Sequence, residues 1–146
     1  MTVIRTTGVD PGSAIAPLPS KLMSDSKTIL LVEDEELFRS MLADLLRFDD
    51  YSVMEAASGD EALTAARSHV GCIDLVVTDI NLSGMTGLQL TNELLKQHPR
   101  MGIIYMSGDT LSGAFGDEKM PDGAQFLPKP FESTALLEKV RQTLRS

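Results

Sequence analysis

The stretch Asp74-Leu75-Val76-Val77-Thr78-Asp79 decides the fold of this 146-residue chain, because a short apolar run ends there in an acid. An uninterrupted apolar run with β-branched residues is typical of a strand buried on both faces of a parallel sheet. The carboxyl ends of parallel strands meet at one edge of a sheet, and the loops there form the usual ligand crevice. We therefore expect Asp79 to lie at a functional site on that edge.

Polar side chains also follow three other short apolar runs. They are the acidic cluster Glu33-Asp34-Glu35-Glu36, Ser107 and Lys129, which stands between two prolines. In a parallel sheet these separated positions would converge with Asp79. Two or three carboxylates, a hydroxyl and an ammonium suit a hard cation such as Mg²⁺ together with a phosphoryl group.

Strand-like and helix-like segments alternate from Lys27 to the end of the chain. This alternation, repeated five times, indicates a doubly wound α/β fold with a five-stranded parallel sheet. Glycines crowd residues 108–123, which predicts that the fourth helix is short or mobile. The predicted strands are Thr28–Val32, Ser52–Ala56, Leu75–Thr78, Gly102–Met106 and Gln125–Leu127, and the other helices are Glu36–Phe48, Ala62–Arg67, Thr86–Gln97 and Ser133–Leu144.

Two local patterns refine the predicted helices. Ser58 followed by Glu61 predicts a capping box at the start of the second helix. Gly87 near the start of the third helix suits close packing. Apolar residues at helical spacing predict the buried face of the first helix, namely Leu37, Met41, Leu42 and Leu45.

Composition limits the other classes of protein. Hydrophobic residues make up 42% and charged residues 23% of the chain, which suits one folded domain, here 27–146, after a tail or linker at 1–26. A net charge of −8 argues against a nucleic-acid partner. The single cysteine, Cys72, cannot form an internal disulfide, and we expect it to be a small, inert hydrophobic residue. No run approaches the length of a membrane span or a secretory signal, so we expect a cytoplasmic protein without a membrane partner.

In combination, these motifs resemble the receiver domains of two-component response regulators. The resemblance covers about residues 28–146 and rests on Leu31–Glu35, Val77–Gly87, Met106–Gly108 and Leu127–Phe131, in the family's order. It implies a flavodoxin-like three-layer sandwich. It also implies that Asp79 takes a phosphoryl group from a histidine kinase or a phosphotransfer protein, with Mg²⁺ as the cofactor.

The resemblance also implies a ligand set for the metal. By position the ligands are Asp34, Asp79, the backbone carbonyl of Asn81 and, through water, Glu33. Glu33 replaces the Asp that is more common at this place, which adds a methylene and could alter the metal geometry.

Ser107, Lys129 and Phe126 complete the implied site. Asp79 acts as a carboxylate nucleophile, a reaction catalysed mainly by positioning and charge neutralisation. Ser107 can donate a hydrogen bond to the acyl phosphate, and Lys129 supplies a point charge to one of its oxygens. Phe126 sits where many members have an aromatic residue that swings inward on activation. Without a hydroxyl, such a switch must rely on packing.

Simpler interpretations exist for each motif alone. The acidic cluster could be a solvated helix start, Ser107 before Gly108 could be part of a turn, and Lys129 could be an exposed loop residue. Phe126 could be a core residue. It is the conjunction of the motifs that favours a functional site.

Two other functional classes compete with a phosphoacceptor that catalyses only its own phosphoryl transfer and dephosphorylation. A receiver-like module that binds partners without phosphorylation is opposed by the intact Asp34, Asp79, Ser107 and Lys129. An aspartate-nucleophile phosphatase of the haloacid dehalogenase type needs a second acid two residues after the nucleophile, where this chain has Asn81. We expect output through protein contacts. The downstream target stays unknown, and the sequence leaves a homodimer open.

Overall fold

Five parallel strands form the centre of the fold, in the order β3-β2-β4-β5-β6. The computed structural model describes residues 26–108 and 118–145. The strand order confirms the predicted doubly wound, flavodoxin-like sheet, since the chain starts in the middle and winds outward in both directions. The strands are β2 (Thr28–Val32), β3 (Ser52–Ala56), β4 (Leu75–Asp79), β5 (Gly102–Ser107) and β6 (Gln125–Pro128).

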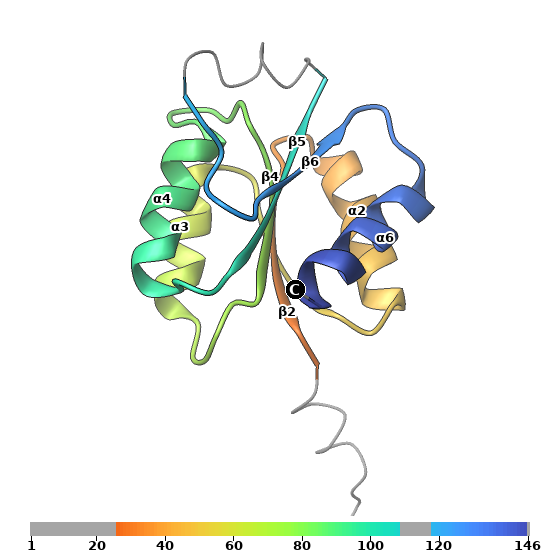
Figure 1. Ribbon diagram of the computed structural model, residues 1–146, viewed down its shortest axis with the longest axis horizontal. Helices are drawn as coiled ribbons and strands as arrows, with labels where there is room; N and C mark the ends of the chain where they lie inside the picture. The colour runs from red at the N-terminus through yellow and green to blue at the C-terminus, as the bar shows by residue number, and fades with distance from the viewer. Residues whose placement is uncertain (1–25, 109–117, 146) are drawn as a thin grey trace, which may run out of the picture.

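Helices cover both faces of this sheet and make the three layers (Figure 1). Helices α2 (Glu36–Phe48) and α6 (Ser133–Arg145) lie on one face, and α3 (Gly59–Ser68) and α4 (Gly87–Gln97) on the other. Alternate residues of the central strands feed two separate cores. In β2, for example, Ile29 packs on the α2 and α6 side and Leu30 on the α3 and α4 side.

The strand register brings the polar positions to one edge. Val32, the last residue of β2, pairs with Thr78 of β4, so that the residues that follow them, Glu33 and Asp79, lie side by side. Three strands, β4, β5 and β6, run one residue further than predicted, because their last residues still pair with a neighbour. Asp79 pairs with Met106, and Ser107 with Pro128. Asp79 and Ser107 therefore end their strands instead of following them.

The predicted buried face of α2 is partly wrong. Leu42 is buried and Leu45 is half-buried, but Leu37 is 80% exposed and Met41 is 58% exposed. Apolar residues occupy more than one stripe of this helix, and only one stripe can face the sheet. That stripe also includes Leu46, which is fully buried.

The capping box predicted at α3 forms only in part. Ser58 Oγ accepts a hydrogen bond from the Glu61 amide, but the Glu61 carboxylate accepts from Ala57 N–H, one residue before the position expected. A complete capping box, which was not predicted, opens α4, where the side chains of Thr86 and Gln89 each accept a hydrogen bond from the other's backbone amide.

Two further expectations concern the loops. Cys72, which we expected to be a small, inert hydrophobic residue, is exposed and precedes β4 in a loop, outside both cores. The region predicted for the fourth helix, 108–123, falls largely outside the described residues. Among the helices that are described, none has the length and apolar character needed to cross a membrane.

Candidate functional site

Three carboxylates meet at the carboxyl edge of the sheet. Oxygens of Glu33, Asp34 and Asp79 all lie within 4.8 Å of one another. Glu33 and Asp34 belong to the loop between β2 and α2, and Asp79 ends the adjacent strand β4. Glu33 and Asp79 are buried, whereas Asp34 is exposed. The cluster therefore has a buried base and one carboxylate that faces solvent.

Lys129 neutralises part of this charge. Its Nζ lies 2.7 Å from Asp79 Oδ1 and 3.0 Å from Glu33 Oε1. The Lys129 amide donates a 2.7 Å hydrogen bond to the Ser107 carbonyl, which holds the residue against the end of β5. The ammonium also lies 5.0 Å from the centre of the Phe38 ring, close enough for a cation–π contact. Lys129 is thus fixed by its backbone and its side chain.

The buried charges shift each other's pKa. Burial, reinforced by the neighbouring Glu33, raises the pKa of Asp79 to about 7, although Lys129 opposes the shift. Burial also acts to raise the pKa of Glu33, but hydrogen bonds to Asp79, the Glu35 amide and Lys129 outweigh it and lower this pKa. Burial alone would lower the pKa of Lys129, yet the two carboxylates raise it. Of these two buried carboxylates, Asp79 is therefore the one that is protonated more readily.

The donor set fits Mg²⁺. Mg²⁺ prefers oxygen ligands, keeps several of its waters and is usually bound through one or two carboxylates. The cluster offers carboxylate oxygens from Asp34 and Asp79, with Glu33 beside them. A dication would also remove the reason for Asp79 to be protonated, since it supplies the positive charge that a proton otherwise provides.

The backbone of Asp79 is held tightly from both sides. Its carbonyl accepts a 2.9 Å hydrogen bond from Thr78 Oγ1. Helix α4 begins directly against it, because Gly87 has no side chain and a Cβ there would collide with the Asp79 carbonyl oxygen. The next residue, Ile80, donates to Met106 of β5 and accepts from the Gly87 amide. The close packing expected at Gly87 is thus confirmed.

The other predicted site residues lie around this cluster. Ser107 is buried at the end of β5, directly after Met106, the register partner of Asp79. Asn81 lies two residues beyond Asp79 in an exposed position and bridges to Thr86. Phe126 is half-buried in β6, paired with Tyr105. The structure brings Glu33, Asp34, Asp79 and Lys129 together, and the roles of Ser107, Asn81 and Phe126 stay predictions.

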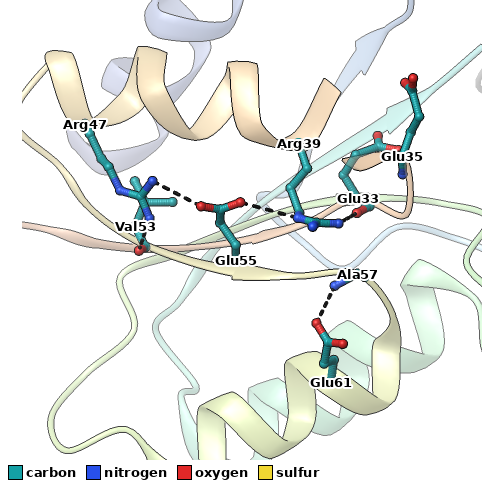
Figure 2. Close-up of polar contacts among 8 residues, drawn as sticks. All are labelled: Glu33, Glu35, Arg39, Arg47, Val53, Glu55, Ala57 and Glu61. Carbon is teal, nitrogen blue, oxygen red and sulfur yellow. Dashed lines mark hydrogen bonds and ion pairs between the residues drawn. The ribbon is translucent and has the colours of Figure 1, made fainter. Parts of the chain in front are cut away.

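Arg39 also contacts the site, although the sequence motifs predict no role for it. Its guanidinium donates a 2.9 Å hydrogen bond to the Glu33 carbonyl and lies 3.4 Å from a Glu55 oxygen (Figure 2). The sequence pattern that could have indicated this contact is a basic residue one turn into the helix that follows the acidic cluster.

A five-stranded parallel sheet with three carboxylates and a lysine at its carboxyl edge defines a receiver domain. Residues 29–141 match the response regulator receiver domain, and the chain belongs to this family.

The most informative relatives come from hybrid kinases and other receivers. The chain is 40% identical over 124 residues to the sensor kinase CckA of Brucella abortus, an alignment that covers 84% of this chain and 13% of that protein. The crystal structure of a receiver domain from the hybrid histidine kinase CckA aligns with 37% identity and a TM-score of 0.64, covering 80% of this chain and 98% of that one. A response regulator receiver protein from Sinorhizobium medicae aligns with 31% identity and a TM-score of 0.75, covering 84% and 98%. The chain spans 13% of the length of that CckA and 57% of the length of another curated relative, FixJ of Azorhizobium caulinodans.

Proposed function

We propose that this chain is a phosphoacceptor in two-component phosphorelay signalling, phosphorylated on Asp79 in a Mg²⁺-dependent transfer from a histidine kinase or a phosphotransfer protein. The observation that carries the proposal is the convergence of Asp79 with Glu33, Asp34 and Lys129 at one edge of the sheet. An acceptor needs a carboxylate nucleophile, a place for a dication and a cation for the phosphoryl oxygens, and this edge offers all three.

Each residue would then have a defined task. A carboxylate oxygen of Asp79 attacks phosphorus, the new P–O bond forms, and the P–N bond to the donor histidine breaks. Mg²⁺, held by Asp34, Asp79, the Asn81 carbonyl and a water on Glu33, would neutralise the charge that builds up on the phosphoryl group. Lys129 would exchange its contact with Asp79 Oδ1 for one with a phosphoryl oxygen. Ser107 would donate its hydroxyl hydrogen to a second oxygen.

The phosphodonor protein needs a surface beside this pocket, and an apolar groove provides one. Residues Phe38, Met41, Leu42, Leu45, Phe48, Phe131 and Ser133 line a cavity of about 310 Å³ between α2 and the start of α6. A second cavity, of about 480 Å³, reaches Lys129 and shares Phe38 and Phe131 with the first. The ring centres of Phe38 and Phe131 lie 5.9 Å apart.

We propose that the phosphodonor protein binds along this groove. Its histidine must reach Asp79, and the groove leads from the lysine of the pocket onto α2. There Leu37, Met41 and Phe48 are exposed, Phe48 by 90% of its surface. Apolar side chains exposed together in this way are typical of a protein contact surface.

Intact mass measured after incubation with Mg²⁺ and acetyl phosphate tests the assignment. We expect one phosphoryl increment, which EDTA and the Asp79→Asn variant each abolish. The matched control is Asp60→Asn, which changes an exposed acid on α3 and should leave labelling unchanged. Undiminished labelling of Asp79→Asn would contradict the assignment of the phosphorylation site.

A further inference from the structure

Arg39 connects helix α2 to the backbone of the acidic loop (Figure 2). Its Nη1 donates a 2.9 Å hydrogen bond to the Glu33 carbonyl oxygen, and its side chain is only 16% exposed. A hydrogen bond from a charged group is stronger than one between neutral groups, and water competes little at a site this covered. The contact therefore restrains Glu33 at its main chain.

The main chain of Glu33 is held at both its amide and its carbonyl group. Its amide donates to the Ala56 carbonyl at the end of β3, at 3.1 Å, while its carbonyl accepts from Arg39. The Glu33 carboxylate in turn accepts from the Glu35 amide at 3.0 Å and from Lys129. The direction in which Glu33 and the following Asp34 present their carboxylates thus depends on two anchors, one in β3 and one in α2.

Glu55 on β3 holds Arg39 in place and balances its charge. The Glu55 carboxylate lies 3.4 Å from Arg39 Nε and 3.1 Å from Arg47 Nη1. Arg47 also donates a 3.1 Å hydrogen bond to the Val53 carbonyl of the same strand. The two arginines therefore make the same pair of contacts, one with Glu55 and one with a backbone carbonyl. Only Arg39 reaches the acidic loop.

We propose that Arg39, oriented by Glu55, is a positioning residue that fixes the acidic loop in the geometry that binds Mg²⁺. This inference rests on the proposed function of the pocket. The charge of Arg39 and its positioning role would have opposite effects on the Mg²⁺ affinity. A cation beside a dication site weakens binding by repulsion, so loss of its charge alone would tighten Mg²⁺ binding. Loss of a group that orients the ligands weakens metal binding, in general by about tenfold or more.

A matched pair of variants separates these effects. Arg39→Met and Arg47→Met each remove one positive charge, one contact with Glu55 and one hydrogen bond to a backbone carbonyl. Calorimetric titration with Mg²⁺ should show binding about tenfold weaker in Arg39→Met and unchanged in Arg47→Met. Equal affinities in the two variants, or tighter binding in Arg39→Met, would overturn the proposal.

A second measurement needs no metal. Because the Glu35 amide donates to the Glu33 carboxylate, its ¹⁵N–¹H resonance reports the arrangement of the acidic loop. We expect Arg39→Met to shift this resonance in the metal-free protein and Arg47→Met to leave it in place. An unshifted resonance in Arg39→Met would contradict the positioning role.

Arg39→Lys decides the matter if Arg39→Met does not fold. Lysine keeps the charge but has no planar fork to bind Glu55 and the Glu33 carbonyl together. We expect weaker Mg²⁺ binding than in the wild type, and wild-type affinity would overturn the proposal. A wild-type protein that binds no Mg²⁺ would instead overturn the proposed function of the pocket itself.

Discussion

Lys129 Nζ lies 2.7 Å from Asp79 Oδ1, although β5 lies between β4, which ends at Asp79, and β6, which Lys129 follows. The lysine reaches across the end of β5, where its own amide is bonded to the Ser107 carbonyl. Asp79 is therefore approached by an ammonium from one side and by the Glu33 carboxylate from the other. The chemistry of the site depends on this balance between one cation and the neighbouring acids.

Removal of the Lys129 charge should strengthen Mg²⁺ binding. The ammonium and the dication are attracted by the same carboxylates and repel each other, so Lys129→Met removes a competitor. We expect a higher Mg²⁺ affinity in calorimetric titration, together with slower labelling by acetyl phosphate because the phosphoryl oxygens lose their cation. Weaker Mg²⁺ binding in this variant would mean that Lys129 orders the carboxylates more than it repels the metal.

Asp34 should be essential for Mg²⁺ binding. It is the exposed member of the carboxylate cluster, and without it Asp79 is the only direct carboxylate ligand of the proposed set. Asp34→Ala should reduce the Mg²⁺ affinity by at least about tenfold, because the loss of a residue that only orients a metal ligand already costs about that much. The control is Asp44→Ala, which removes an exposed acid from α2, the helix that follows the acidic loop. Wild-type affinity in Asp34→Ala would remove this residue from the site.

The stability of the metal-free protein should fall as the pH rises from about 4 to about 7. The folded state holds the Asp79 proton up to a pKa of about 7, while the unfolded chain releases it near the ordinary value of 3.8. The unfolded state therefore binds fewer protons in this window, and unfolding becomes easier with increasing pH. The lowered pKa of Glu33 acts in the opposite direction and offsets part of the effect.

Asp79→Asn should flatten this pH dependence, because asparagine cannot ionise. In urea denaturation with EDTA we expect the variant to be more stable than the wild type at about pH 8 and similar to it at about pH 4. Mg²⁺ should raise the wild-type stability at the higher pH and leave the variant unchanged. A wild-type stability that rises through this range, with Asp79→Asn showing the same slope, would mean that Asp79 is ionised in the folded protein.

Gly87→Ala should destabilise the protein by about 3 kcal/mol, the upper range for an overpacked site. The added methyl group meets the Asp79 carbonyl oxygen and the Ile80 backbone, which cannot turn aside as a side chain could. Gly108→Ala is the control, since a Cβ there has no neighbour within 4 Å among the described residues. Equal melting temperatures for the two variants would show that the start of α4 can shift without cost.

Phosphorylation should reorganise the segment from Ser107 to Phe126 more than any other. Ser107 and Lys129 are joined through their backbones, and both can be drawn toward new phosphoryl oxygens. Hydrogen exchange with and without beryllofluoride should show changed protection at the end of β5 and around Phe126, with little change in α2. If protection changed only around Glu33 and Asp79, the predicted metal site would still stand, but the predicted rearrangement of Ser107 and Phe126 would be contradicted.

The sequence was sufficient for the sheet and for the convergence of the site. Uninterrupted apolar runs such as Leu75–Val77 require burial on both faces, and parallel topology then places every strand end at one edge. Contacts that depend on how helices sit on the sheet could not be obtained in this way. The exposed face of α2 and the bond from Arg39 to Glu33 both follow from the rotation of that helix, which a periodic pattern with several apolar stripes leaves undetermined.

The absence of a side chain at Gly87 makes the two walls of the pocket mechanically unequal. On the side formed by β4 and α4, the main chain at Asp79 and Ile80 packs directly against the start of α4 and is hydrogen-bonded to β5, so it has little room to move. On the opposite side, the Lys129 amide is held by the Ser107 carbonyl, but its ammonium ends a four-carbon stem and is held by ion pairs that a new charge on Asp79 would alter. A charge added to Asp79 therefore meets a fixed support on one side and an adjustable one on the other. We therefore expect any displacement that it causes to be directed toward β5 and β6, away from the helix that begins at Gly87.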